Sequence, residues 1–222
     1  MPPAISKRRQ RRLQVRQLLR ARDMEGLQNL AEQDPNLISG LVAQLNERDS
    51  LLCWRAVEAL GLLCAGLARR DLPAARNQIR RQFWTMTEES GNQAWHTPEA
   101  IAEMLYHVPQ LAQELGPNLA QHQEEPIFRP GVLWAIGRLA SRYPELMQED
   151  VRVVPPHLGD PVPLVRAHAA WALGQLRYDQ ARKPLRLALG DTAAAELYSF
   201  ASGELVATTV AELAREALER LA

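Results

Sequence analysis

The sequence predicts an all-α fold, an α-solenoid of about five helix pairs that forms a single domain over residues 1–222. Three observations predict it: a short apolar motif recurs, a proline precedes each copy at a similar distance, and turn-forming residues lie between the two. The motif has the form Ala-(Leu/Ile)-(Gly/Ala)-x-(Leu/Met), with a weaker last copy, and its Gly or Ala falls at positions 61, 102, 137, 174 and 211. A period of 35 to 41 residues is typical of stacked helical repeats.

Each repeat is predicted to contain a helix A, a turn and a helix B that carries the motif. Proline suits the first turn of helix A, because its missing N–H would have no partner there. These prolines are Pro35, Pro73, Pro109, Pro144 and Pro184. Turn residues follow at 47–50, 90–92, 125–126, 159–161 and 202–203, and residues 5–30 are expected to form a preceding cap. No β-sheet is expected.

The small residue of the motif is expected to let neighbouring B helices approach closely. Apolar residues on one helical face around it form the predicted core. A bulky side chain at Gly137 or Gly174 is therefore expected to overpack the contact between two B helices.

Charge is distributed unevenly although the formal net charge is zero. Residues 1–22 contain eight basic side chains and no acidic one, which leaves a formal charge of −8 on the rest of the chain. Residues 1–12 are expected to be a flexible basic tail. This basic end could contact nucleic acid or an acidic partner, or it could be a solvated helix whose charges balance the body.

Cysteine usage and the absence of targeting signals favour a cytoplasmic location. Cys53 and Cys64 lie eleven residues apart on one expected helix, roughly 16 Å, which is too far for a disulfide. Free thiols suit a reducing compartment. The N-terminal arginines are not followed by an apolar run, and no stretch is expected to reach the length of a membrane span.

One segment carries a resemblance to a known family. The run Asp160-Pro161-Val162-Pro163-Leu164-Val165-Arg166, followed by Ala-His-Ala-Ala-Trp-Ala-Leu-Gly-Gln-Leu up to residue 176, resembles the HEAT-repeat family. It is most similar to the subgroup first noted in phycobilisome lyases. The resemblance covers roughly residues 25–220 and implies a HEAT/armadillo-like solenoid, although such repeats serve many functions.

In such arrays the B helices line the concave side, so an exposed stripe of helix B is the candidate binding surface. Trp and Arg are enriched among residues that dominate binding energy. The predicted stripe contains Arg55, Glu58, His96, Glu99, Glu103, Trp134, Arg138, His168 and Trp171. The alternative interpretation is that Trp134 and Trp171 simply pack between neighbouring B helices.

The segment between the two helices of the second repeat is a further candidate. Residues 83–99 are unusually long for a turn and contain Trp84, Glu88, Glu89 and Trp95. Long loops on rigid scaffolds often carry function. Trp84 and Trp95 are expected to lie near each other at the concave mouth, with Glu88 or Glu89 hydrogen-bonded. Alternatively, the two indoles fill an irregular gap in the stack.

The sequence predicts no catalytic residue, no cofactor and no metal. Glu99, Glu103 and His107 share a helical face one turn after His96, a pattern that can ligate a metal. Similar repeat hydroxylases bind iron through His-Glu dipeptides, and this chain has none. It likewise has no phosphate-binding glycine loop, no Gly-x-Ser-x-Gly and no Cys-x-x-Cys.

The leading hypothesis is a non-enzymatic interaction scaffold that binds a protein or peptide partner, with no contact to a membrane. The first alternative is a cofactor-handling factor of the phycobilisome-lyase type, with a pocket formed by Trp84, Glu88, Glu89, Trp95 and His96. The second alternative is a nucleic-acid-binding repeat protein, which only the basic N-terminus favours.

Overall fold

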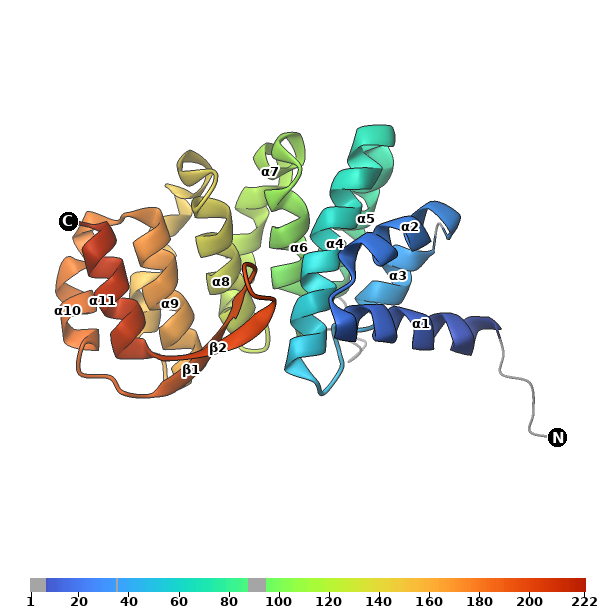
Figure 1. The fold of residues 1–222 in the computed structure, drawn as a ribbon. Coiled ribbons are helices and arrows are strands. Elements are labelled where there is room, and N and C mark those ends of the chain that lie inside the picture. Colours follow the sequence, from blue (N-terminus) through green and yellow to red (C-terminus); the bar gives the residue numbers. More distant parts are fainter. Residues whose placement is uncertain (1–6, 35, 88–94) are drawn as a thin grey trace.

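The computed structural model describes residues 7–34, 36–87 and 95–222, which form a stack of helices in two layers (Figure 1). The predicted all-α solenoid of about five helix pairs is confirmed. In each repeat, a helix that carries the repeated motif pairs with a segment from the second layer.

One layer, here called the B layer, consists of the helices that carry the motif. They are α4 (Ser50–Arg70), α6 (Thr97–Tyr106), α8 (Arg129–Ala140), α9 (Pro163–Leu176) and α11 (Val210–Arg220). Each packs on the next in this order. A Cβ atom added to Gly137 would lie 2.6 Å from the ring of Trp171 in α9, and one added to Gly174 would lie 2.8 Å from the backbone of Ala217 in α11. The small residue therefore sets the separation of neighbouring B-layer helices, as expected.

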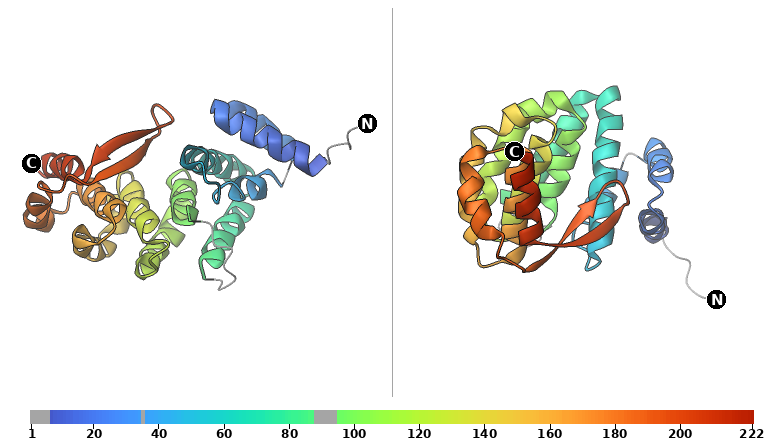
Figure 2. Two further views of the ribbon diagram at one scale, coloured as in Figure 1. Left: turned by 90° about the horizontal axis from the view of Figure 1, so that it is seen from below. Right: turned by 60° about the vertical axis from the view of Figure 1, so that its left-hand side comes forward.

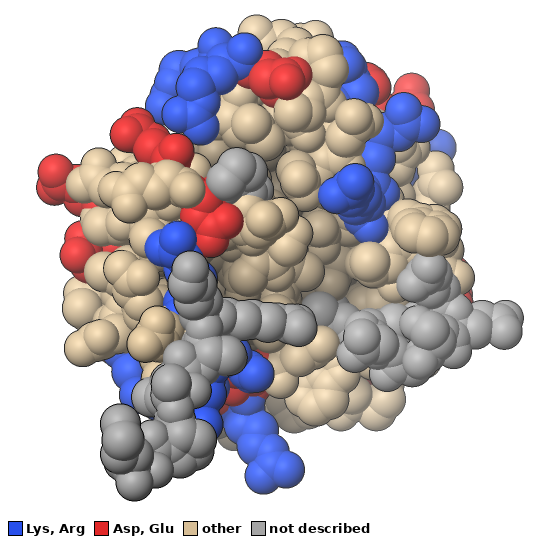
Figure 3. Space-filling model, turned by 90° about the vertical axis from the view of Figure 1, so that its right-hand side faces the viewer, with Lys and Arg blue, Asp and Glu red and all other residues tan. Residues whose placement is uncertain are grey.

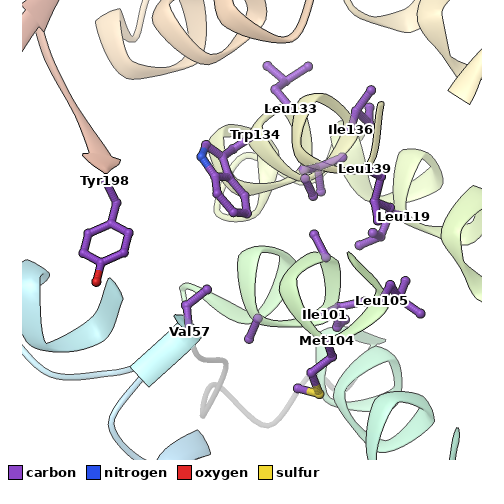
Figure 4. Packing of buried hydrophobic residues seen from close by; sticks show 14 of the residues in the cluster. Val57, Ile101, Met104, Leu105, Leu119, Leu133, Trp134, Ile136, Leu139 and Tyr198 are labelled. Carbon is purple, nitrogen blue, oxygen red and sulfur yellow. The ribbon is translucent and has the colours of Figure 1, made fainter. Parts of the chain in front are cut away.

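The other layer, here called the A layer, contains both α-helices and 3-10 helices. Its α-helices are α3 (Leu37–Val42), α5 (Leu72–Thr87), α7 (Pro109–Leu115) and α10 (Arg182–Ala188). Its 3-10 helices are η1 (Gly116–Glu124), η2 (Pro144–Met147), η3 (Asp150–Val153), η4 (Pro155–Gly159) and η5 (Asp179–Ala181). Figure 4 shows the core between the layers, where Leu119 of η1 faces apolar side chains of α6 and α8.

The prolines predicted to open the A helices lie at or near helix starts. Pro109 and Pro144 occupy the first positions of α7 and η2, and Pro73 and Pro184 follow closely after the starts of α5 and α10. Pro35 lies outside the described residues. In the fourth repeat the A segment consists of short 3-10 helices, because closely spaced prolines remove backbone donors that an α-helix would need.

Two helices precede the first repeat: α1 (Lys7–Ala21) and α2 (Met24–Gln33). Arg22, with φ of 51°, connects them, and the Asp23 carboxylate caps α2 by accepting a hydrogen bond from the N–H of Gly26. Residues 1–12 were expected to form a flexible tail. For residues 7–12 this expectation is wrong, because they form the start of α1. There Arg11 pairs with Asp34 at 3.1 Å. Residues 1–6 lie outside the described part of the chain.

The expectation of no β-sheet is wrong in the fifth repeat. Strands β1 (Ala194–Ser199) and β2 (Glu204–Thr209) form an antiparallel hairpin between α10 and α11. Residues 202–203, predicted to join two helices, lie in the hairpin turn, where Gly203 has φ of 73°. The β-branched residues Val206, Thr208 and Thr209 favour an extended backbone, and this local preference prevails over the repeat pattern.

Helix α4 corrects the expectation that no stretch reaches the length of a membrane span. This helix is long enough and apolar enough to cross a membrane. Among the described residues, no other helix meets both criteria. In this fold 61% of its 18-residue apolar window is buried, because α1, α2, α3, α5 and α6 pack around it. A core helix that is apolar on nearly all sides meets the same criterion.

Helix α4 also contains both cysteines, and the prediction that they form no disulfide is confirmed. Cys53 and Cys64 are free and buried. Burial raises the pKa of Cys53 to about 11 and the pKa of Cys64 to about 12, so both thiols are protonated at neutral pH.

Replacing Gly137 with Leu should lower the free energy of unfolding by about 1–3 kcal/mol, because the new side chain must displace Trp171. Urea denaturation followed by circular dichroism measures this change. The control is Gly40→Ala in α3, where an added Cβ meets no atom within 4 Å. That variant should be as stable as the wild type or more stable by up to about 1 kcal/mol. Equal denaturation midpoints for Gly137→Leu and the wild type would contradict the close approach of α8 and α9.

Candidate functional site

The candidate surface predicted from the sequence lies on the B layer, on the side that also carries the hairpin and α1. Figure 2 shows the β1–β2 hairpin leaving the C-terminal helices and extending along this face toward the N-terminal ones. The hairpin therefore brings residues near position 200 into contact with α4 and with the connection between α1 and α2.

Tyr198 of β1 is the main contact of the hairpin with α4. Its ring stacks on Trp54 with centroids 5.6 Å apart and planes at 6°. Its hydroxyl donates a hydrogen bond of 2.5 Å to Oε2 of Glu58. Burial raises the pKa of Tyr198 well above its usual value, and the hydrogen bond and charge of Glu58 raise it further. The phenol is therefore held in its neutral, donating form.

Phe200, just beyond β1, packs on the next part of the same face. Its ring centroid lies 6.2 Å from that of Trp134 and 5.1 Å from that of Tyr198. The guanidinium of Arg138 lies 4.1 Å from the Phe200 centroid and 3.6 Å from that of Tyr106, a cation–π contact with each ring.

Two arginines from the N-terminal part of the chain bind the hairpin and α4 together. Arg22 donates to both carboxylate oxygens of Glu58, at 3.1 and 2.7 Å, and to a backbone carbonyl of the hairpin turn. Arg55 donates to the carbonyl of Gly203 at 3.1 Å and to Glu204 at 2.6 Å. The first repeat and the fifth are thus joined by partly buried charged hydrogen bonds, a class stronger than neutral ones.

The expectation that the stripe is exposed is wrong for most of its residues. The exposed fractions are 9% for Arg55, 8% for Glu58, 3% for Glu99, 2% for Trp134 and 2% for His168. Glu103 is fully buried, and His96, Arg138 and Trp171 are half-buried. The B-layer helices pack closely and the hairpin contacts their common face, a contact that a purely helical interpretation does not contain. Their predicted role in partner binding stays a prediction.

The two tryptophans of the stripe, Trp134 and Trp171, form a continuous row with Trp54 of α4. Trp54 and Trp134 pack edge to face at 4.8 Å, and Trp134 stacks on Trp171 at 5.9 Å. Figure 4 shows the Trp134 indole on the side of the core that faces Tyr198. This geometry is the alternative considered above, in which the indoles pack between neighbouring B-layer helices.

His96, Glu99 and His168 form a polar group beside this row, in which Glu99 and His168 are buried and His96 is half-buried. Nδ1 of His96 lies 3.2 Å from Oε1 of Glu99, and Nδ1 of His168 donates to the carbonyl of Pro130 at 2.7 Å. Burial lowers the pKa of His96, but the charge of Glu99 and the hydrogen bond to it raise the pKa, and the net change is upward. Burial lowers the pKa of His168, which favours its neutral form. Oε2 of Glu99, which lies against Gly131, and Nε2 of His168 make no hydrogen bond with other described residues.

Glu103 forms a separate charged group. Arg138 donates to both of its carboxylate oxygens, at 2.7 and 3.0 Å, and His107 lies 3.0 Å from Oε1. A guanidinium that occupies both oxygens competes with a metal for them. Among residues 7–34, 36–87 and 95–222, no group of three or more His, Cys, Asp or Glu side chains is arranged to hold a metal ion.

The two tryptophans of the second repeat lie outside the buried row. Trp84 in α5 is 65% exposed and Trp95, just before α6, is 66% exposed. Their expected proximity stays a prediction, and Glu88 and Glu89 lie outside the described residues. The pocket considered for a cofactor also stays a prediction; of its residues, His96 packs edge-on against the buried Trp54.

A pocket of about 500 Å³ opens in the A layer beside Trp84. Its walls come from α5, α7 and η1. Its lining residues are Arg80, Phe83, Trp84, Thr87, Glu114, Leu115, Asn118, Gln121 and His122. The rings of Phe83 and His122 lie 6.1 Å apart and form one side, and burial lowers the pKa of His122. The pocket thus combines aromatic and aliphatic surface with amide and guanidinium donors.

Arg22, Tyr198 and Phe200 are site residues that were not predicted from the sequence. Gly203 and the β-branched run that follows it are typical of a hairpin and could have been recognised in the sequence. The partners of Arg22 could not, because they lie in α4 and in the hairpin, far apart in the sequence.

Replacing Tyr198 with Phe should lower the free energy of unfolding by about 1.5–3 kcal/mol, because Glu58 loses a buried donor while the ring stack persists. The matched control is Tyr178→Phe, which removes an exposed hydroxyl bonded to Gln180 and should change stability by no more than about 0.5 kcal/mol. Urea denaturation of both variants makes the comparison. If the two variants lose the same small amount, Tyr198 does not anchor the hairpin.

Comparison with known families agrees with this architecture. Residues 126–176 match the family model of the HEAT-like repeat. The matched segment contains α8, the 3-10 helices η2–η4 and α9, which are one B-layer helix, the following A segment and the next B-layer helix. A search of curated proteins found no match. The chain is therefore a helical-repeat protein that contains a HEAT-like repeat at residues 126–176.

Proposed function

We propose that this protein is a non-enzymatic interaction scaffold that binds a segment of a partner protein in the A-layer pocket beside Trp84. Helical repeats often serve as extended binding surfaces. The observation that carries the proposal is the contrast between tryptophans: Trp84 is 65% exposed at the edge of an open pocket, whereas Trp134 is 2% exposed in the B layer.

The chemistry of the pocket suits an apolar side chain carried on a peptide. Phe83, Trp84 and Leu115 provide an apolar wall, and Arg80 and Asn118 provide hydrogen-bonding groups at its rim. An exposed indole beside a guanidinium is typical of residues that contribute most to binding energy. The remaining lining residues are polar or charged, so a peptide that carries hydrogen-bonding groups beside its apolar side chain suits the pocket.

The B-layer face is a less suitable place for the partner, because the hairpin already occupies part of it. A partner that bound there would have to break the contacts of Tyr198 with Trp54 and Glu58. A buried aromatic stack and a charged hydrogen bond together oppose such displacement.

The finer resemblance, to the phycobilisome-lyase subgroup, rests on the Asp-Pro-Val-Pro-Leu-Val-Arg run at residues 160–166. Here Arg166 donates to the carbonyl of Asp160 at 2.8 Å and to Asp191 at 2.6 Å, and Arg129 donates to Asp160 at 3.2 Å. We infer that these motif residues join successive repeats. This structural role accounts for the motif without a bound tetrapyrrole.

Replacing Trp84 with Ala should weaken partner binding by more than about 1 kcal/mol, because the pocket loses its largest apolar wall. The free energy of unfolding should change by less than about 0.5 kcal/mol, since the indole is mostly exposed. Affinity capture from the native host, quantified by mass spectrometry for wild type and variant, measures the binding.

The matched control is Trp95→Ala, which removes an equally exposed indole, 66% against 65%, that does not line the pocket. Proteins captured by the wild type and by Trp95→Ala but not by Trp84→Ala would be partners of the pocket. If capture is identical for all three proteins, the A-layer pocket does not bind the partner.

A further inference from the structure

A second cleft, of about 940 Å³, lies at the N-terminal end of the stack. Arg9, Arg11, Arg12 and Val15 of α1 form one wall. The opposite wall comes from the end of α2 and from α3 with its flanking residues. Its lining residues are Gln33, Asp34, Asn36, Leu37, Ser39, Gly40, Ala43 and Gln44. The cleft is distant in sequence from the Trp84 pocket and shares no lining residue with it.

The α1 wall is rich in arginine, and neighbouring arginines of this helix share a carboxylate. Arg12 and Arg16 share one carboxylate, that of Glu47, at 3.2 and 3.0 Å. Arg11 pairs with Asp34 at 3.1 Å. The helix contains no acidic residue. Figure 3 looks onto this end of the molecule: Lys and Arg side chains lie around much of the face, while most acidic side chains in view gather toward one edge.

The floor of the cleft combines apolar surface with an unsatisfied acceptor. Val15 and Leu37 are buried there, each 2% exposed. Gln44 is 1% exposed, and its Oε1 makes no hydrogen bond with the described residues. Its Nε2 donates a long hydrogen bond of 3.4 Å to the carbonyl of Gly40. An unpaired buried acceptor is costly, so a ligand that donates a hydrogen bond here gains affinity.

These features define the class of ligand. Guanidinium groups at the rim bind carboxylates or phosphates. The acceptor of Gln44 requires a donor, which a peptide backbone N–H provides and an ionised phosphate diester does not. No residue that lines the cleft is aromatic, so bases of a single-stranded nucleic acid would have no ring to stack on. A peptide that carries both carboxylates and apolar side chains fits the rim and the floor.

We propose that the cleft between α1 and α3 binds an acidic, partly apolar segment of a partner protein. Carboxylates of the segment pair with Arg9 and Arg12, its apolar side chains contact Val15 and Leu37, and a backbone N–H donates to Gln44. This site is independent of the Trp84 pocket, so an experiment can contradict one of the two proposals without contradicting the other.

Gly40 offers a direct test, because it lines the cleft and a Cβ added there meets no atom within 4 Å. Gly40→Leu fills the cleft from the α3 side without changing any charge. Arg9→Ala/Arg12→Ala removes the charge without filling the cleft. The control Arg69→Ala/Arg70→Ala removes two exposed arginines at the end of α4, outside the cleft.

The probe is a short fluorescein-labelled peptide in which Glu alternates with Leu and Ala, and binding to the full chain is measured by fluorescence anisotropy. The same peptide with Gln in place of Glu, and a labelled oligothymidylate, are measured in parallel. The wild type should bind the Glu peptide at least tenfold more tightly than either. Gly40→Leu and Arg9→Ala/Arg12→Ala should each weaken binding at least tenfold, and the Arg69/Arg70 control should bind like the wild type.

Two results would overturn the proposal. If Gly40→Leu, folded by circular dichroism, binds the Glu peptide as tightly as the wild type, the peptide contacts surface charge and not the cleft. If oligothymidylate binds more tightly than the Glu peptide and Arg9→Ala/Arg12→Ala abolishes that binding, the basic helix is a nucleic-acid surface.

Discussion

The close approach of neighbouring B-layer helices is the constraint on which the structure depends. At Gly137 and Gly174 there is no room for a side chain, because an added Cβ would lie within 3 Å of Trp171 and of the Ala217 backbone. This spacing places the indoles of the neighbouring helices α8 and α9 in contact, where Trp134 stacks on Trp171. Trp54 of α4 extends the row by meeting Trp134 edge to face. The small residues allow the helices to approach closely, and the tryptophan side chains fill the space beside them. These tryptophans therefore contribute to packing, although the same residue type is common in binding sites.

The hairpin packs on this row of tryptophans and shields part of it from solvent. It inserts Tyr198 and Phe200 against Trp54 and Trp134, while Arg22 and Arg55 bind its turn from the N-terminal side. In a repeat array each unit otherwise contacts its neighbours, and stability is close to a sum of local terms. Here the first and fifth repeats also contact each other, which adds long-range cooperativity. Binding surfaces are then expected where side chains remain exposed, in the A layer and at the α1 end.

The local parts of this fold could be predicted from the sequence, and the long-range parts could not. The helices of the B layer, the small residues within them and the prolines of the A layer follow from spacing and from the backbone properties of Gly, Ala and Pro. The hairpin was missed because the repeat period favoured a helix where Val206 and Thr208 favour a strand. The burial of Glu58 and Arg55 depends on partners from residues 22 and 198–204, and no periodic pattern indicates such contacts. Exposed Trp84 and buried Trp134 look alike in the sequence, and the fold distinguishes them.

The central claim is that the Trp-rich face of the B layer is closed within the chain itself, and solvent accessibility of the tryptophans tests it most directly. The chain can be labelled with 5-fluorotryptophan, its five indole signals assigned by single Trp→Phe variants, and each ¹⁹F relaxation rate measured with a soluble paramagnetic agent. The structure predicts strong relaxation enhancement at Trp84 and Trp95 and little at Trp54 and Trp134, which are 5% and 2% exposed. Enhancement at Trp134 as large as that at Trp84 would contradict the account, because it would mean that the hairpin leaves this face open to solvent.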